Sequence, residues 1–281
     1  MSVTKRNLRP TVLSKNRKRA GARRRLHAVL VGINIYQDPR ISNLQFAAAD
    51  ARTFHDALRR TLSAKELNTV LLMDAQATLS SVRRSIGEDL ARAAERDDLV
   101  LLFFAGHGAP ELDDLISPPN RYLIMNDTKY DQIFSTALDM EVELVRLLDR
   151  IRSRNVVVFI DSCFSGVAGG RTLEGPTLNR LRHEFRTSAF SLSELDFGEG
   201  RVLITACKDQ ELALEDPKLS HGVFTYCLLQ TLLTDSPSSR IISLLTLYDE
   251  IATQVVRITN GEQNPVLKGS MTSQKMPYLK P

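Results

Sequence analysis

Short apolar runs alternate with amphipathic helical segments along most of the chain, and this alternation limits the fold more than any other feature. Apolar residues at helical spacing predict helices at 44–62, 79–95, 139–153, 222–234 and 241–258. The runs between them predict strands at 26–33, 67–73, 99–104, 121–125, 155–160 and 201–205, with an edge strand at 263–269. Strands separated by helices favour a mainly parallel sheet that helices cover on both faces.

Positive charge is concentrated in the first 25 residues, which hold ten Lys or Arg and no acidic residue. The other 27 basic residues of this 281-residue chain face 33 acidic ones, so the body is mildly acidic. We therefore expect a basic disordered tail at 1–25 and one folded domain at 26–281. The tail could bind nucleic acid or another polyanion, or remain solvated with no partner. The acidic body makes nucleic acid an accessory partner at most.

The composition also narrows the cellular setting. Three widely spaced cysteines cannot form a disulfide framework, which favours a reducing, cytoplasmic compartment. No apolar stretch approaches the roughly 18 residues of a membrane span, so no membrane partner is expected. The first 25 residues hold no apolar segment typical of a signal peptide.

Two predicted strands end in residues that could do chemistry. The strand at 99–104 runs into His107, between two glycines, and the strand at 155–160 runs into Cys163. The carboxyl ends of parallel strands share one edge, so neighbouring strands would bring the imidazole and the thiol together. A thiol beside an imidazole can lose its proton and attack a carbonyl carbon, which predicts a catalytic dyad. The backbone N–H groups of Gly108 and Cys163 would hold the oxyanion.

Each of these signals has a simpler explanation when it is taken alone. A lone cysteine at a strand end is usually a core residue, and Gly-His-Gly is often only a turn. We expect core positions for Cys207, just beyond a predicted strand, and for Cys227, within a predicted apolar helix. No Cys and His pair has zinc-finger spacing, so no metal site is predicted. The remaining histidines lack a comparable strand-end setting: His27, His55, His183 and His221.

The order of the motifs resembles the caspase-like cysteine peptidases of the metacaspase, paracaspase and bacterial caspase-homologue group (peptidase clan CD, family C14). The resemblance covers roughly residues 26–269. It implies a caspase-like three-layer α-β-α sandwich with about six strands, and a cysteine endopeptidase activity. The matching segments are 31–36, 46–51, 104–108, 160–166, 204–210, 213–216, 221–226 and 263–266.

Details of the motifs place the chain within this group. His107 precedes Cys163 by 56 residues, close to the spacing of about 50 in caspases. The residues before Cys163 are Ile-Asp-Ser, where animal caspases have Gln-Ala, which favours the metacaspase side and argues against cleavage after aspartate. Ala105 and Phe164 stand where many metacaspases have serine and histidine, and both differences leave the dyad intact.

Acidic residues in apolar surroundings predict the substrate preference. Asp50 lies on the apolar stripe of a predicted helix, and Asp161 directly follows an apolar strand. A buried carboxylate needs a cation or hydrogen bonds, and the resemblance assigns Asp50, Asp161 and Glu215 to an acidic pocket. That pocket would bind an arginine before the cut, with lysine second and aspartate very poor. Alternatively, Asp161 caps a loop, Glu215 is an exposed loop acid, and Asp209 or Asp216 supplies the third carboxylate.

The segment 162–200 is long for a connection inside a compact domain and is rich in glycine. In the resembling family, chains are often nicked here during activation, so the enzyme would be a zymogen. An enzyme specific for arginine could cut itself after Arg171, Arg180, Arg182 or Arg186, or an upstream protease could cut it. A disordered surface loop with incidental arginines is the alternative.

The resemblance also implies protein substrates, no required cofactor, and a role in programmed cell death, stress responses or bacterial antiviral defence. A catalytically silent caspase-fold adaptor is the competing function, and the presence of both dyad residues argues against it. Calcium dependence, known in part of the family, is open, because no recognisable binding loop is present. Oxygen ligands could come from Asp113, Asp114, Asp127 or Asp131.

Overall fold

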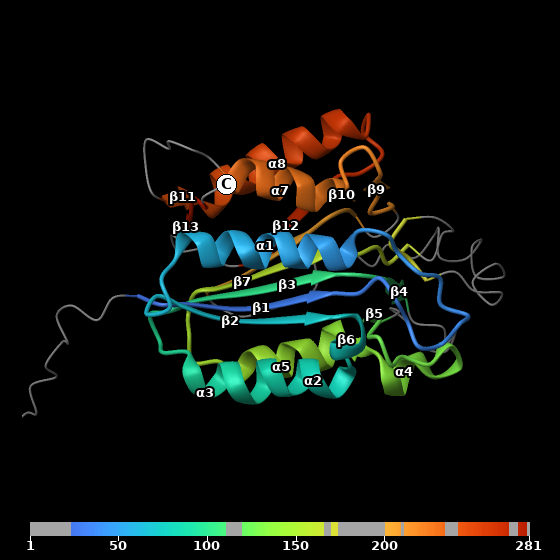
Figure 1. The fold of residues 1–281 in the computed structure, drawn as a ribbon, viewed down its shortest axis with the longest axis horizontal. Coiled ribbons are helices and arrows are strands. Elements are labelled where there is room, and N and C mark those ends of the chain that lie inside the picture. The colour runs from blue at the N-terminus through green and yellow to red at the C-terminus, as the bar shows by residue number, and fades with distance from the viewer. Residues whose placement is uncertain are drawn as a thin grey trace, which may run out of the picture.

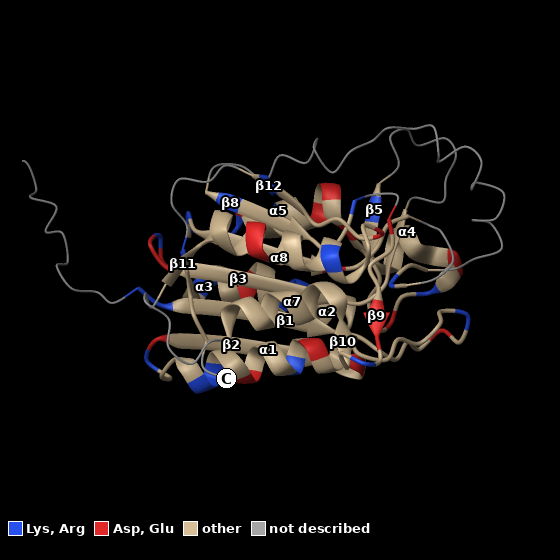
Figure 2. Cartoon of the chain, turned by 90° about the horizontal axis from the view of Figure 1, so that it is seen from above, with Lys and Arg blue, Asp and Glu red and all other residues tan. Residues whose placement is uncertain are grey.

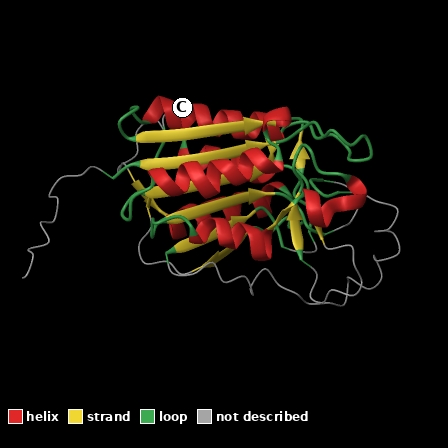
Figure 3. Cartoon of the chain, turned by 90° about the horizontal axis from the view of Figure 1, so that it is seen from below, coloured by secondary structure: helices red, strands yellow, loops and turns green. Residues whose placement is uncertain are grey.

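A six-stranded sheet in the order β12-β8-β7-β3-β1-β2 forms the centre of the molecule. The structure is a computed structural model that describes residues 24–110, 120–165, 170–173, 200–208, 211–233, 241–269 and 275–279. The edge strand β12 (Val266–Gly269) runs antiparallel to β8, and the other strands point to the same edge of the sheet (Figure 3). These parallel strands are β1 (Leu26–Gly32), β2 (Leu67–Met73), β3 (Leu99–Ala105), β7 (Val156–Asp161) and β8 (Arg201–Thr205).

Helices cover both faces of this sheet (Figure 1). One face carries α1 (Ala47–Thr61), α7 (Val223–Leu232) and α8 (Leu244–Ile258). The other face carries α2 (Leu79–Arg84), α3 (Ala91–Ala93) and α5 (Val145–Asp149).

Two apolar clusters fill the spaces between the sheet and its helices. Successive residues of β1 point alternately into each, because side chains alternate along a strand: Val29 and Val31 join one cluster and Leu30 the other. The predicted three-layer α-β-α sandwich with a mainly parallel sheet is therefore confirmed.

Three small sheets complete the fold. β4 (Gly108–Pro110), β5 (Arg121–Leu123) and β6 (Leu138–Asp139) form one, with α4 (Ile133–Thr136) between the last two strands in the chain. The second pairs β9 (Glu215–Asp216) with β10 (His221–Gly222). The third pairs β11 (Ile241–Ser243) with β13 (Lys275–Pro277). Short 3-10 turns lie at Asp74–Gln76 and Tyr130–Gln132.

The structure corrects several details of the sequence prediction. The predicted 241–258 helix begins at Leu244, because Ile241–Ser243 pair with β13 as a strand. A π-helical turn at Ser85–Leu90 separates α2 from α3, so 79–95 is not one α-helix. A second π-helical turn at Met140–Leu144 begins the 139–153 helix, which ends at Asp149. The strand predicted at 121–125 is shorter, Arg121–Leu123 (β5), and it belongs to a small sheet and not to the central one. Apolar spacing cannot anticipate such local winding. At the first π-turn a Cβ on Gly87 would meet the Leu147 side chain at 2.7 Å, so glycine lets α5 pack closely there.

Charged residues lie along the helices and connections, and the strands of the central sheet are almost free of them (Figure 2). None of the helices in the described part of the chain combines the length and apolar character needed to span a bilayer. Residues 1–23 of the predicted basic tail lie outside the described residues. Most of the predicted long loop, 166–169 and 174–199, also lies outside them.

Candidate active site

The two predicted catalytic residues follow neighbouring strands at the same edge of the sheet. β3 pairs with β7 in parallel, with Ala105 opposite Asp161. The N–H of Gly106 donates to the carbonyl oxygen of Asp161 at 3.4 Å. His107 and Cys163 each lie two residues beyond the last pair of this ladder, and both are buried. The parallel pairing thus brings the imidazole-bearing and thiol-bearing segments to one edge.

A backbone carbonyl determines which nitrogen of the His107 ring carries the proton. Nε2 lies 2.7 Å from the carbonyl oxygen of Ser42, and a carbonyl only accepts hydrogen bonds, so Nε2 is the protonated nitrogen. Nδ1 is then the free acceptor, and it is buried with no hydrogen-bond partner among the described residues. Burial lowers the pKa of His107 to about 4, so the ring is neutral near pH 7. The Tyr36 hydroxyl accepts the backbone N–H of His107 at 2.9 Å.

The buried Cys163 thiol has hydrogen-bond partners of its own. Sγ lies 2.6 Å from the carbonyl oxygen of Glu211 and 3.0 Å from the hydroxyl of Ser165. Burial opposes ionisation of this thiol, but hydrogen bonds from Cys207 and Ser165 outweigh it and lower the pKa of Cys163 to about 7. Within the described part of the chain, no hydrogen bond joins Sγ to the His107 ring.

Alkylation of Cys163 is expected to follow a titration with its midpoint near pH 7, not near the ordinary thiol value of 9. The thiolate is the reactive form and its fraction grows as pH rises through the pKa, so the rate with iodoacetamide should climb and then level off. Mass spectrometry of the labelled peptide measures this rate at each pH. Cys227 is the internal control, because burial raises its pKa to about 12. A midpoint near 9 would contradict the lowered pKa.

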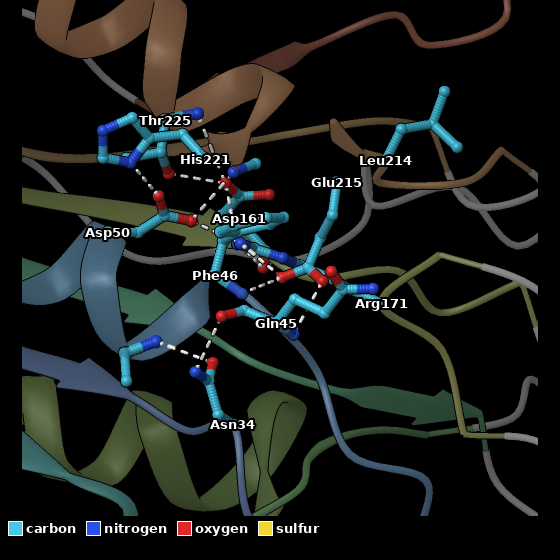
Figure 4. Close-up of polar contacts among 12 residues, drawn as sticks. Asn34, Gln45, Phe46, Asp50, Asp161, Arg171, Leu214, Glu215, His221 and Thr225 are labelled. Atoms are coloured by element: carbon cyan, nitrogen blue, oxygen red, sulfur yellow. Dashed lines mark hydrogen bonds and ion pairs between the residues drawn. The ribbon is translucent and has the colours of Figure 1, made fainter. Parts of the chain in front are cut away.

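The three predicted pocket acids meet around one guanidinium, and this guanidinium belongs to the chain itself (Figure 4). The side chain of Arg171 places Nη1 2.8 Å from Asp161 and Nη2 3.1 Å from Glu215. Nη2 also pairs with Asp50. The side chains of Arg171, Asp50 and Asp161 are completely buried, and that of Glu215 is 12% exposed. Three carboxylates from α1, β7 and β9 therefore share one buried cation.

Hydrogen bonds from neighbouring segments hold all three carboxylates in place. The donors lie 2.5–3.3 Å from the carboxylate oxygens: Thr225 on Asp161, His221 and Gly222 on Asp50, and the backbone N–H groups of Gln45 and Phe46 on Glu215. Burial raises the pKa of Asp161 to about 6, against the opposing effect of the Arg171 charge. Glu215 is thus not the exposed acid of the alternative interpretation. Asp216 accepts from the N–H of Lys218, and Asp209 lies outside the described residues.

The backbone of Arg171 occupies the predicted oxyanion position. Its carbonyl oxygen accepts the N–H groups of Gly108 and Cys163, each at 3.1 Å. Its own N–H donates to the carbonyl oxygen of Ala213 at 2.9 Å. Two residues later, the N–H of Leu173 donates to the carbonyl oxygen of Gly108 at 3.0 Å. Residues 170–173, called here the docked segment, are therefore bound with the Arg171 carbonyl next to the thiol-bearing residue.

Sequence reasoning missed several residues of this site. Ser42 acts through a backbone carbonyl, which leaves no signature in the sequence. Tyr36 accepts a main-chain N–H with its hydroxyl, and the available signal was its position in the matching segment 31–36. His221 follows no strand end, so its setting predicts no role in the site, yet its Nδ1 donates to Asp50. The only available signal was its position in the matching segment 221–226.

Several other predicted residues lie elsewhere or outside the described chain. Arg180, Arg182 and Arg186 are outside it, as are Asp113 and Asp114. Two further calcium candidates already have partners: Asp127 accepts the N–H of Leu79, and Asp131 pairs with Arg40. In the part of the chain that the structure describes, no group of three or more His, Cys, Asp or Glu side chains could hold a metal ion.

An α-β-α sandwich with a histidine and a cysteine at the ends of neighbouring parallel strands defines the class of caspase-fold proteins. A family model described as the caspase domain of the C14 peptidases matches residues 25–277. The chain belongs to this family, which confirms the resemblance.

Solved structures agree on the fold. Protein GSU0716 from Geobacter sulfurreducens is 22% identical, with a TM-score of 0.62 over 88% of this chain and 95% of that one. Caspase-1 from Spodoptera frugiperda is 12% identical, with a TM-score of 0.54 over 92% of this chain and 90% of that one. At such low identity these likenesses establish the fold alone. A search of curated proteins found no match.

Proposed function

We propose that this protein is a cysteine endopeptidase that cleaves proteins after arginine, with lysine second. One observation carries the proposal: the docked segment presents a guanidinium to three carboxylates while the carbonyl of the same residue accepts the N–H groups of Gly108 and Cys163. A substrate arginine in that position would have its scissile carbonyl polarised by two donors next to the thiol. Membership of the C14 family supports a peptidase activity, although this family also includes inactive proteins of the same fold.

The groups of the site support a two-step reaction. The Cys163 thiol gives its proton to Nδ1 of His107, and Sγ attacks the carbonyl carbon of the substrate arginine. The two backbone N–H groups hold the oxyanion of the tetrahedral intermediate. The imidazolium then donates its proton to the leaving amine, which breaks the C–N bond and leaves a thioester. His107 next takes a proton from water, and the resulting hydroxide attacks the thioester carbon. The C–S bond breaks to free the acid product, and the imidazolium returns its proton to the Cys163 thiolate.

The same arrangement supports cleavage of the chain by itself after Arg171. Of the four arginines predicted as cleavage sites, Arg171 is the one that the described residues include, and it occupies the acidic pocket. A bound docked segment excludes a substrate in trans, so the intact chain would be a zymogen. Release of the docked segment, by this cut or by an upstream protease, would open the pocket.

One alternative rests on the same contacts. Arg171 could be a permanent counterion for the three acids in a protein that has the fold but no activity, and the missing hydrogen bond between Sγ and the imidazole favours this alternative. Such a protein would act as an adaptor through protein association. Activity on peptides separates the two functions.

Three peptides that differ only in having Arg, Lys or Asp before the cut test the specificity. We expect kcat/KM to be highest for Arg and roughly tenfold lower for Lys, whose ammonium cannot match the planar fork of guanidinium contacts. Asp should be at least about a hundredfold slower, because it adds an unpaired charge to a buried acidic site. The assay uses the wild-type chain and Gly170→Ala, whose added Cβ would lie 2.6 Å from the Ala213 carbonyl oxygen and so release the docked segment. Faster cleavage after Asp would overturn the specificity, and no cleavage by either chain would support the adaptor.

A further inference from the structure

The docked segment remains buried beyond Arg171. Thr172 and Leu173 are each only 1% exposed. Gly108 accepts the N–H of Leu173 and donates to the carbonyl of Arg171, so the docked segment runs parallel to the start of β4. If Arg171 is the residue before the cut, Thr172 and Leu173 are the first and second residues after it. The site thus contacts the part of the substrate after the cut, which leaves first as the amine product.

The surroundings of these two residues differ in character. The hydroxyl of Thr172 is buried and has no hydrogen-bond partner among the described residues, so this position offers no polar recognition. Leu173 belongs to the same apolar cluster as Ala109, Tyr122 and Phe164. Ala109 and Tyr122 lie opposite each other in the small sheet of β4 and β5.

Gly108 lets the apolar ring of Phe164 approach the docked segment. A Cβ on Gly108 would come within 2.7 Å of the Phe164 ring and 2.5 Å of the Cys163 carbonyl oxygen, so only glycine fits between them. The ring therefore lies against the backbone that binds the N–H of Leu173. An apolar surface and a main-chain acceptor together form a subsite for one residue.

We propose that this surface is a specificity subsite for the second residue after the cut and that it selects an aliphatic side chain such as leucine. The substrates are then proteins in which arginine is followed, two positions later, by a leucine-like residue. This inference rests on the proposed function, since it takes Arg171 as the residue before the cut. A hydrophobic subsite for one side chain discriminates by roughly tenfold to a hundredfold in kcat/KM.

Peptides that extend across the cut test the subsite without any change to the protein. The first carries the sequence of residues 169–173, Gly-Gly-Arg-Thr-Leu, and the second has Asp in place of Leu. A third has the order Arg-Leu-Thr, which separates the position of the leucine from overall hydrophobicity. A donor and quencher pair at the ends reports cleavage by the Gly170→Ala chain, in which the added Cβ would lie 2.6 Å from the Ala213 carbonyl oxygen and so release the docked segment. We expect the first peptide to be cut roughly tenfold to a hundredfold faster than the second, and faster than the third.

Self-cleavage of the full chain gives an independent reading. Leu173→Asp should slow the cut after Arg171 by roughly tenfold to a hundredfold. Leu173→Met, which keeps an apolar side chain, should retain most of the wild-type rate. Equal cleavage of the Leu and Asp peptides would overturn the subsite and leave the proposed function intact. Absence of cleavage after arginine in every peptide would overturn both.

Discussion

Replacing Arg171 with alanine is expected to destabilise the folded chain by about 3 kcal/mol and to make its stability depend on added guanidinium compounds. The substitution leaves three converging carboxylates, two of them fully buried, without their cation. An added guanidinium that enters the pocket restores the missing charge and binds only the folded state. At a hundred times its Kd such a ligand contributes about 2.7 kcal/mol.

Thermal unfolding with and without agmatine measures this effect. Agmatine should raise the Tm of Arg171→Ala and leave the Tm of the uncut Cys163→Ala chain unchanged, because the Arg171 side chain fills the pocket of the uncut chain. An uncharged urea analogue of agmatine should have no effect. Arg40→Ala is the matched control: Arg40 also pairs with two carboxylates, but at the surface, where ion pairs contribute little. Unchanged stability of Arg171→Ala, together with no response to agmatine, would show that the pocket does not require a guanidinium.

Gly170→Ala should release the docked segment without removing any charge. Gly170 has φ +64°, and a Cβ there would lie 2.6 Å from the Ala213 carbonyl oxygen, so alanine is both strained and sterically blocked. Gly261→Ala is the matched control, because Gly261 has φ +86° with open space around its Cβ position. Only the first variant should accelerate cleavage of Arg peptides in trans. Equal behaviour of the two variants would mean that the docked segment does not limit access.

Cys163→Ala is expected to abolish peptide cleavage and self-cleavage, with a loss of at least about a thousandfold in kcat. Sγ is the atom that forms the acyl-enzyme in the proposed reaction, and neither alanine nor a bound water replaces it. Intact-mass measurement should find the wild-type chain cut between Arg171 and Thr172 and the variant chain whole. The substitution changes the side-chain volume little, so the variant should fold, and circular dichroism checks this.

Cys227→Ala is the control for the loss of a buried thiol, because Cys227 is a buried residue of α7 that the proposed reaction does not use. It should keep full self-cleavage. Fragments from purified Cys163→Ala protein would point to an external protease. Cuts after Arg180, Arg182 or Arg186 in the wild type, with Arg171 left intact, would favour the permanent-counterion interpretation.

The layered fold could be predicted because its cause is local. Buried parallel strands such as β7 are continuous apolar runs, and helices such as α1 carry an apolar stripe, so the pattern along the chain already specifies the layers. The π-helical turn at Ser85–Leu90 could not be predicted, because apolar spacing along the chain does not distinguish π from α winding.

The chain alone determined that histidine and cysteine end two strands and that Asp50 and Asp161 lie in apolar surroundings, because each of these facts needs only residue type and neighbouring positions. Tertiary structure alone decided which groups complete the site. Ser42 contributes a carbonyl that every residue type possesses, and Arg171 meets Asp50 across 121 positions of sequence. Contacts made through the main chain or between distant segments depend on the folded geometry, so no local pattern records them.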